Sequence, residues 1–425
     1  MASEKQIFAA VEAADHEIRL IVGEFFNTRF NIIKVERVPV SGMSYNKVTD
    51  PEEVTKAVST AAADAQKMIG AAVKKVILAI PSYRAKRYSF KSTVDVEGID
   101  GVVTIQDVRN AIKKAESMDI GRAYALIQTV CVKYTVNGIS TRRIPLGEKC
   151  SQLTVDIDLL CADRQLAYDL VTCVENAGLG VMDIFLDVFG VGKESALFNQ
   201  AIDHQVIILK MEREATTLGL LRNGRLTSAA LMPVGIGTIA SAVTEKYGIR
   251  TDMAVELLKY SCSLDKEKCS ENPVHIWAAD GETRTINEQE LVDCVREGVD
   301  TWLAAIAKTC VPILQAGKTA VMITGEGGET QGLDVLLQNQ LGVPVTYYIP
   351  ETLGGRNAGL TACLGLFYAY QDKLPITGQA DDSLDMDAFI KAVSYRDKKS
   401  SDGSREDTLT NKLKGLFSEG KRNLN

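Results

Sequence analysis

Short apolar runs separated by polar turns open the chain and are typical of β-strands. Runs at 7–11, 18–22 and 30–35 predict three strands of an antiparallel meander. The Asp50–Pro51 pair then supplies a capping side chain and a first helical residue, which predicts a helix reaching Ala71. A further apolar run after this helix predicts a buried strand.

The same order of elements returns in the second half of the chain. Strands are expected at 206–209, 217–221 and 226–231, with Asn223–Gly224 as the tight turn between the last two. Helices and one more strand follow, and these are expected at 237–247, 251–261, 287–316 and 320–324. The repeated order predicts a duplicated α/β architecture.

Two other segments depart from this plan. Residues 82–160 alternate strands with a helix at 104–117, and they predict an inserted unit. Residues 371–407 are rich in Asp, Ser, Lys and Gly, a composition typical of a linker.

The last segment, 408–425, has an apolar face and a basic character. Its apolar residues fall at helical spacing i, i+4, i+7 and i+8: Leu409, Leu413, Leu416 and Phe417. Lys412 and Lys414 lie between them. This pattern predicts an amphipathic helix on an anionic membrane surface. The alternative, a helix docked on the protein body, fits the preceding polar linker less well.

Composition narrows the possible function classes. The 425 residues are 46% hydrophobic and 24% charged, typical of a soluble globular protein with several units. The net charge of −7 argues against a nucleic-acid binder with a basic surface. The nine cysteines show no metal-binding spacing, so a reducing compartment is expected. No run of eighteen apolar residues predicts a membrane span, and the N-terminus lacks a signal-peptide pattern.

One loop carries charges that its position does not explain. Glu212, Arg213 and Glu214 follow the apolar run 206–209 directly, where a strand leaves the core. A tight loop at this place ordinarily needs small residues, so the three long side chains require a reason.

An ordered set of motifs resembles the FtsA family of bacterial cell division proteins, within the actin/Hsp70/hexokinase superfold. The motifs are FAAVEAADHEIRLIVGE, TIQDVRNAIKKA, VKYTVNGISTRRIPLGEKCSQLTVDIDLL, LMPVGIGTIA, TDMAVELLKY, ITGEGGETQGLDVLL, LGVPVTYYIPE and GLTACLGLFYAY. The resemblance implies an α/β fold of duplicated actin-like domains with an FtsA-type inserted subdomain. The implied boundaries are 1–81 with 161–200 for the first domain, 82–160 for the insert, 201–370 for the second domain (smaller subdomain about 228–300), 371–407 for the linker and 408–425 for the membrane helix.

The resemblance also locates two phosphate-binding loops, and both depart from the family pattern. Lys210 stands where the family has an Asp, and 212–214 replace glycines that let the backbone approach phosphate. In the first loop Glu12, Ala14 and Asp15 stand for the family's Asp, Gly and hydroxyl residue. Carboxylates repel a triphosphate. Either Arg213 or Lys210 contacts phosphate directly, or the loop charges pair with one another. Efficient ATP hydrolysis is not expected, and ATP or ADP with Mg²⁺ would bind weakly or not at all.

The adenosine side keeps more of the family pattern. The resemblance implies base and ribose contacts from Gly325, Gly327, Gly328, Gly332, Glu256 and Lys259. The alternatives are an ordinary glycine turn and a surface ion pair between Glu256 and Lys259.

The family implies a structural protein on the cytoplasmic side of the cell membrane at the division site. Its implied partners are FtsZ, further copies of the chain, the anionic membrane surface and downstream division proteins, with no nucleic acid. No catalytic or metal-binding residue is assigned. The alternatives are a nucleotide-hydrolysing enzyme or chaperone of the same superfold, and an actin-like adaptor of pilus assembly.

Overall fold

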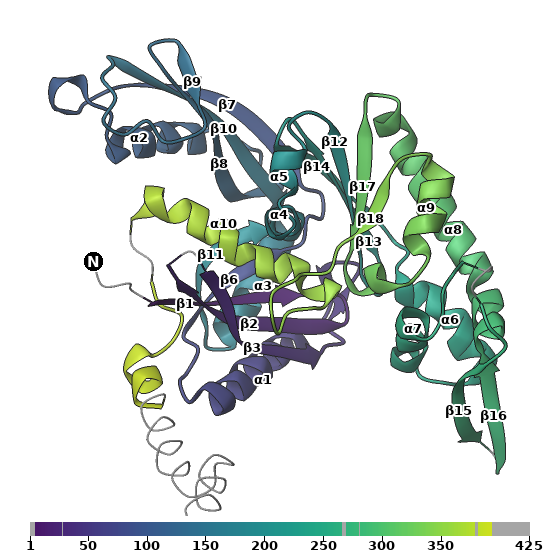
Figure 1. Cartoon of the computed structure of the whole chain (residues 1–425). Coiled ribbons are helices and arrows are strands. Elements are labelled where there is room, and N and C mark those ends of the chain that lie inside the picture. Colours follow the sequence, from purple (N-terminus) through teal and green to yellow (C-terminus); the bar gives the residue numbers. More distant parts are fainter. Residues whose placement is uncertain (1–4, 28, 266–268, 280, 379–380, 393–425) are drawn as a thin grey trace, which may run out of the picture.

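The protein consists of two α/β halves with a smaller unit attached to the first (Figure 1). The computed structural model describes residues 5–27, 29–265, 269–279, 281–378 and 381–392.

The first half is built on a five-stranded sheet of order β11-β6-β1-β2-β3. Its strands are β1 (Lys5–Ala13), β2 (Glu17–Phe26), β3 (Arg29–Pro39), β6 (Lys75–Ile80) and β11 (Gly180–Leu186). Strands β1, β2 and β3 form the predicted antiparallel meander, while β6 and β11 run parallel to β1. A small hairpin of β4 (Met43–Ser44) and β5 (Lys47–Val48) follows the meander.

Helices pack against both faces of this sheet. They are α1 (Pro51–Ile69), α3 (Arg164–Asn176), α4 (Asp187–Glu194) and α10 (Thr361–Thr377), and the short helix α5 (Leu197–Gln200) packs on α4. Helix α1 begins as predicted, because the Asp50 side chain accepts hydrogen bonds from the amides of Glu52 and Glu53. It ends at Gly70, whose φ of 85° suits the left-handed cap. Helix α1 packs on α3, and α10 packs on α4 (Figure 1).

The second half repeats the sheet. Its order is β14-β13-β12-β17-β18. Taken from β18 to β14, this order matches the first sheet from β11 to β3, which confirms the predicted duplication. Its strands are β12 (Gln205–Met211), β13 (Thr216–Arg222), β14 (Arg225–Met232), β17 (Thr319–Thr324) and β18 (Val345–Tyr347). The turn between β13 and β14 has positive φ at both Asn223 (54°) and Gly224 (69°), as the sequence pair predicts.

A largely helical unit shares a hydrophobic core with the second sheet. It comprises α6 (Ile236–Tyr247), α7 (Thr251–Tyr260), β15 (Pro273–Ala279), β16 (Glu282–Asn287), α8 (Glu288–Leu314), the 3₁₀ turn η3 (Glu326–Glu329) and α9 (Leu333–Leu341). The turn η4 (Ala358–Leu360) then leads into α10.

The inserted unit has its own sheet and core. A four-stranded antiparallel sheet of order β7-β10-β8-β9 packs against α2, as the sequence predicts. The elements are β7 (Lys86–Asp95), η1 (Ile99–Gly101), α2 (Ile105–Glu116), β8 (Tyr124–Val136), β9 (Ile139–Thr141) and β10 (Gln152–Asp163).

The expected linker starts later than its composition suggests. Helix α10 continues to Thr377, and Ser383 is fully buried against the first sheet. The Ser383 hydroxyl accepts from the amide of Ala9 at 2.8 Å, and its own amide donates to Ile7 at 3.0 Å. Backbone hydrogen bonds hold this polar segment, so an apolar pattern does not reveal it. Residues 379–380 and 393–407 of the expected linker and the membrane segment 408–425 lie outside the described residues. In the described part of the chain, no helix is long and apolar enough to cross a membrane.

Candidate functional site: the interdomain ion cluster

The two hairpin loops singled out by the sequence face each other between the halves. The turn between β1 and β2 contains Asp15, and the loop between β12 and β13 contains 212–215. The Asp15 carboxylate accepts from the amide of Glu214 at 2.6 Å and from that of Arg213 at 3.3 Å. A carboxylate of the first half thus occupies backbone donors of the second.

Two buried cations bridge the halves in opposite directions. Arg19, on β2, donates two hydrogen bonds to the Glu212 carboxylate at 2.9 and 2.7 Å. Lys210, on β12, contacts Glu12 of β1 and lies 2.9 Å from Asp187 at the start of α4. Arg19 is 0% exposed and Lys210 4% exposed. Each cation therefore has carboxylate partners on the opposite half.

Neighbouring charges determine the protonation states of Arg19, Lys210 and Glu17. Burial alone would lower the pKa values of Arg19 and Lys210, but the surrounding carboxylates raise both above their usual range. Burial would raise the pKa of Glu17, but Arg19 and Arg37 lower it to about 2. Both cations therefore remain charged, and Glu17 is ionised, at neutral pH.

A second set of ion pairs lies toward the glycine-rich turn. Arg213 donates to both oxygens of Glu326 at 3.2 and 2.8 Å, and it also pairs with Asp252. His16 has Nδ1 at 2.9 Å from Asp15 and Nε2 at 3.3 Å from Glu326. Burial would lower the pKa of His16, but Asp15 and Glu326 raise it to about 9. His16 and Arg213 in turn overcome the effect of burial and hold the pKa of Glu326 well below its usual range.

The third loop charge also binds across the halves. The Glu214 carboxylate accepts from the Ser44 hydroxyl and the Tyr45 amide, both at 2.9 Å. The carboxylates of Glu212 and Glu214 therefore bind groups of the first half, whereas the Arg213 side chain pairs with Glu326 and Asp252 within the second half. Of the two possibilities left open by the sequence, this geometry matches charges that pair with one another. We use "interdomain ion cluster" for Glu12, Asp15, His16, Glu17, Arg19, Asp187, Lys210, Glu212, Arg213 and Glu326.

The interdomain ion cluster does not fit a nucleoside triphosphate. The loop amides of Arg213 and Glu214 already donate to Asp15. The first amides of α6, Ile236 and Gly237, donate to loop carbonyls at 2.9 and 2.8 Å. The donors of a helix start that ordinarily attract phosphate are therefore satisfied within the chain. A phosphate entering here would have to displace carboxylates from two buried cations.

Close packing explains several glycines of the turn that the sequence analysis assigned to adenosine binding. A Cβ on Gly325, whose φ is 88°, would lie 2.5 Å from the Met211 carbonyl oxygen. A Cβ on Gly327 would lie 2.6 Å from the Met211 sulfur. Gly332 has a φ of 82°, whereas a Cβ on Gly328 would make only ordinary contacts. Close packing of the turn on the β12–β13 loop requires small residues there, and the nucleotide contacts of these glycines stay a prediction.

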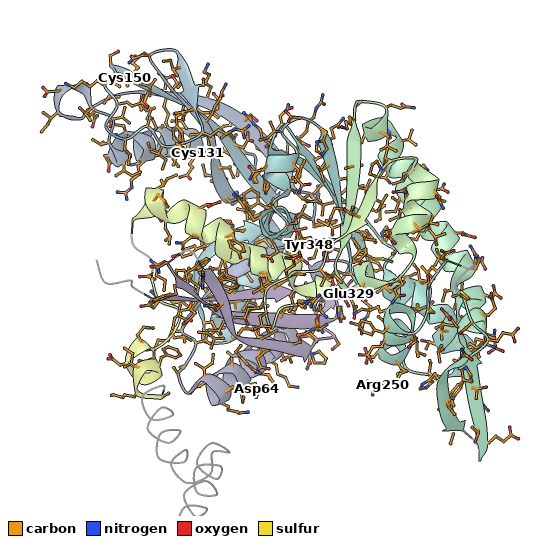
Figure 2. All side chains as sticks on the ribbon, viewed as in Figure 1. Asp64, Cys131, Cys150, Arg250, Glu329 and Tyr348 are labelled. Carbon is orange, nitrogen blue, oxygen red and sulfur yellow. The ribbon has the colours of Figure 1, made fainter. Side chains whose placement is uncertain are left out.

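The two predicted site residues on helix α7, Glu256 and Lys259, lie in different environments. Glu256 is exposed, whereas Lys259 is 4% exposed and its Nζ lies 3.4 Å from Glu329. Glu329 lies near the junction of the two halves (Figure 2). Lys259 therefore takes part in a buried contact rather than in the surface pair with Glu256.

Sequence reasoning found part of the cluster. It singled out Lys210 and Arg213, and the structure brings both to the junction. It missed Arg19, although a charge within the otherwise apolar run 18–22 is a visible signal. Asp187 and Glu326 gave no local sign, because their partners come from distant segments.

Removing one buried cation should destabilise the protein strongly. In Arg19→Ala the Glu212 carboxylate stays buried without its partner, so the free energy of unfolding should fall by about 3–5 kcal/mol. Urea unfolding measures this change. Arg84→Ala removes a pair with Asp163 at a site where Arg84 is 57% exposed, and it should cost less than about 1 kcal/mol. The double variant Arg19→Met with Glu212→Leu should be less destabilised than Arg19→Ala. Equal stability of Arg19→Ala and wild type would contradict the role of the cluster.

His16 should make the cluster sensitive to alkaline pH. Its pKa is about 9 in the folded chain against an ordinary 6.5. Its contribution is therefore complete below about pH 6.5 and is lost as the pH rises through 9, with an upper limit of about 3 kcal/mol. The loss of stability in His16→Gln should be largest at pH 6 and much smaller at pH 10, measured by urea unfolding. His204→Gln, in the turn before β12, controls for loss of a histidine. An equal loss in His16→Gln at both pH values would contradict this prediction.

Comparisons with known proteins agree with this architecture. The family described as "SHS2 domain inserted in FTSA" matches residues 84–161. Cell division protein FtsA of Bacillus subtilis is 21% identical over 370 residues, covering 86% of this chain and 83% of the relative. The Enterococcus hirae FtsA is 22% identical over 438 residues, covering 97% and 98%.

Solved structures with a similar fold agree with this architecture. A chain of the PilM-PilN type IV pilus biogenesis complex aligns with a TM-score of 0.56 at 13% identity, covering 85% of this chain and 98% of that chain. MreB5 of Spiroplasma citri bound to ADP aligns with a TM-score of 0.52 at 10% identity, covering 88% and 99%. The chain is thus related to cell division protein FtsA over most of its length, with an actin-like fold that carries the SHS2 domain inserted in FtsA.

Proposed function

We propose that this chain is an actin-like cell division protein that tethers FtsZ polymers to the cytoplasmic side of the cell membrane. The observation that carries the proposal is the inserted SHS2 unit within an actin-like fold, combined with similarity to FtsA over most of the chain. The smaller unit at about 228–300 binds FtsZ in this proposal. The inserted unit mediates contacts between copies of the chain and with downstream division proteins.

Membrane attachment is assigned to the terminal segment 408–425. Its apolar residues and its lysines suit insertion at the surface of an anionic bilayer. A single helix of this kind binds reversibly, with roughly 1 kcal/mol from each basic residue near the surface. Polymerisation multiplies the attached helices and makes the overall attachment firm.

The interdomain ion cluster replaces nucleotide as the link between the two halves in this proposal. Its carboxylates already occupy the loop amides and the buried cations at the junction. The protein then acts as a filament-forming adaptor with weak or absent ATP or ADP binding. A nucleotide-hydrolysing enzyme or chaperone would need donors free to receive phosphate.

Nucleotide should leave the stability of the protein unchanged. A ligand at a hundred times its dissociation constant adds about 2.7 kcal/mol and would raise the midpoint of thermal unfolding by several degrees. We expect no such shift with millimolar Mg·ATP or Mg·ADP, measured by differential scanning calorimetry. A shift of several degrees, or steady-state hydrolysis at several turnovers per second, would refute the replacement of nucleotide by the cluster.

Tethering should require the terminal segment. The full chain should sediment with vesicles containing phosphatidylglycerol and should carry FtsZ polymers with it. A chain ending at residue 407 should leave both in the supernatant. The full-length variant Leu413→Asp with Phe417→Asp should behave like the truncation, while Asn411→Asp with Asn423→Asp matches its charge change and should sediment. Equal sedimentation of the truncated and full chains would remove the membrane role, and vesicles that sediment the full chain without FtsZ would remove the tether.

A further inference from the structure

A basic groove lies where the inserted unit meets the second half. It encloses a cavity of about 720 Å³ lined by residues of β7, β8, the segment after β9 and the β13–β14 hairpin. We call it the arginine groove and define it by its five cationic residues: Arg87, Lys133, Arg142, Arg222 and Arg225. These cations come from two units that are distant in sequence, so the fold alone brings them together.

Only some of these charges are neutralised by the protein. Asp158 is 3% exposed and lies 3.7 Å from Arg87 and 3.4 Å from Arg225. Lys133 pairs with Asp156 at 3.3 Å. Five cations thus meet two carboxylates, an excess of three positive charges on a protein whose net charge is −7.

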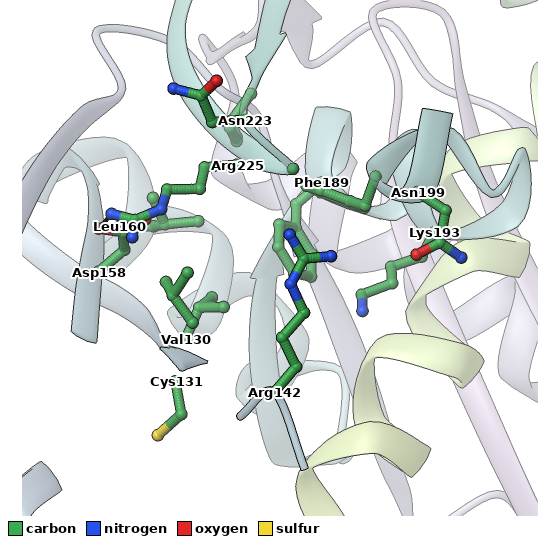
Figure 3. A pocket seen from close by; sticks show the side chains of 14 residues that line it. Val130, Cys131, Arg142, Asp158, Leu160, Phe189, Lys193, Asn199, Asn223 and Arg225 are labelled. Atoms are coloured by element: carbon green, nitrogen blue, oxygen red, sulfur yellow. Dashed lines mark hydrogen bonds and ion pairs between the residues drawn. The ribbon is translucent and has the colours of Figure 1, made fainter. Parts of the chain in front are cut away.

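Two arginines of the groove have free side chains. Arg142 and Arg222 are exposed, and neither guanidinium makes a hydrogen bond or ion pair with any described residue. Figure 3 shows Arg142 reaching between the Arg225–Asp158 pair on one side and Lys193 on the other. Arg142 and Arg222 are therefore available to a ligand from solvent.

Four of the five cations lie on strands or beside a tight turn, and Arg142 lies directly after β9. Arg87 lies on β7 and Lys133 on β8, both of which pair with β10. Arg222 and Arg225 flank the tight turn at Asn223–Gly224, and the Gly224 amide donates to Ala201 at 2.9 Å. A binding site on such elements loses little conformational freedom when a ligand enters.

A second cavity of about 220 Å³ adjoins the groove, and its walls mix polar groups with the apolar side chains of Val130, Leu160 and Phe189. The two cavities share Val132, Arg142, Asn223 and Arg225. Lys193 lies 5.4 Å from the ring centroids of both Phe189 and Phe198, beside this second cavity. A ligand with an anionic group and a less polar body can therefore place one part in each cavity.

We propose that the arginine groove binds a phosphate monoester or pyrophosphate group, at a site separate from the interdomain ion cluster. Four of the five cations are arginines, whose planar guanidinium donates two parallel hydrogen bonds to phosphate oxygens. One phosphate group concentrates several acceptor oxygens and close to two charges at one point, which matches the convergence of unpaired cations. A bound phosphate bridges the inserted unit and the β13–β14 hairpin, and so stabilises their relative orientation.

Binding of inorganic pyrophosphate to the full chain, measured by isothermal titration calorimetry at constant ionic strength, tests the soluble form of the ligand. The double variant Arg142→Gln with Arg222→Gln should raise the dissociation constant at least about tenfold. The control Arg143→Gln with Arg122→Gln removes the same charge from two exposed arginines of the inserted unit that do not line the groove. It should bind nearly as wild type.

Sedimentation with vesicles containing phosphatidic acid tests the same chemistry on a lipid headgroup. Both double variants keep the terminal segment 408–425, so a difference between them reports on the groove alone. Weaker binding of Arg142→Gln with Arg222→Gln only to pyrophosphate assigns a soluble phosphate ligand, and weaker binding only to vesicles assigns a lipid headgroup.

Failure of this proposal is distinguishable from failure of the cluster proposal. If the double variant bound both probes as tightly as its control, or if wild type bound neither, the arginine groove would not be a phosphate site. Pyrophosphate binding that survives in the double variant but is lost in Lys210→Ala, at a temperature where Lys210→Ala keeps the circular dichroism spectrum of wild type, would place phosphate at the interdomain ion cluster and overturn both proposals.

Discussion

The exchange of buried charges between the two halves is the constraint on which the rest of the structure depends. Arg19 reaches from the first half to Glu212, and Lys210 reaches from the second half to Glu12 and Asp187. A buried cation that loses its carboxylate partner destabilises the protein by several kcal/mol. Both cations therefore favour the arrangement in which the two halves are in contact. The closed arrangement is therefore encoded in the side chains themselves.

The duplicated fold explains why these groups meet. In both halves the hairpin after the first strand of the sheet ends at the junction, so the Asp15 turn and the 212–214 loop face each other. The resemblance to the FtsA family implies a phosphate site formed by these two hairpins, because their backbone amides can bind an anion. Here the Asp15 carboxylate accepts hydrogen bonds from the amides of Arg213 and Glu214 instead. The contact between the two halves is made by ion pairs within the chain.

Strand β13 connects the two charged regions of the molecule. Its first residue, Thr216, follows the loop of the interdomain ion cluster, and its last residue, Arg222, lines the arginine groove. The cluster has matched charges and is buried, whereas the groove has an excess of positive charge and is open. The two sites therefore differ in their chemistry: the first joins protein to protein within the chain, and the second is suited to an anion from outside.

The sequence by itself determined the elements and their order. The apolar periodicity located the two meanders, the Asp50 cap located α1, and the Asn223–Gly224 pair located the β13–β14 turn, because each of these signals depends on near neighbours in the chain. The sequence also predicted that 212–214 would not form an ordinary phosphate loop. Only the tertiary structure showed which groups these charges pair with, because Arg19 and Glu212 are 193 residues apart in the sequence. It likewise decided the burial of Lys259 beside Glu329 and the docking of Ser383 on the first sheet. The physical reason is that an ion pair or a backbone hydrogen bond forms only between groups that the fold brings within about 3 Å of each other. A local sequence pattern does not determine which distant groups come that close.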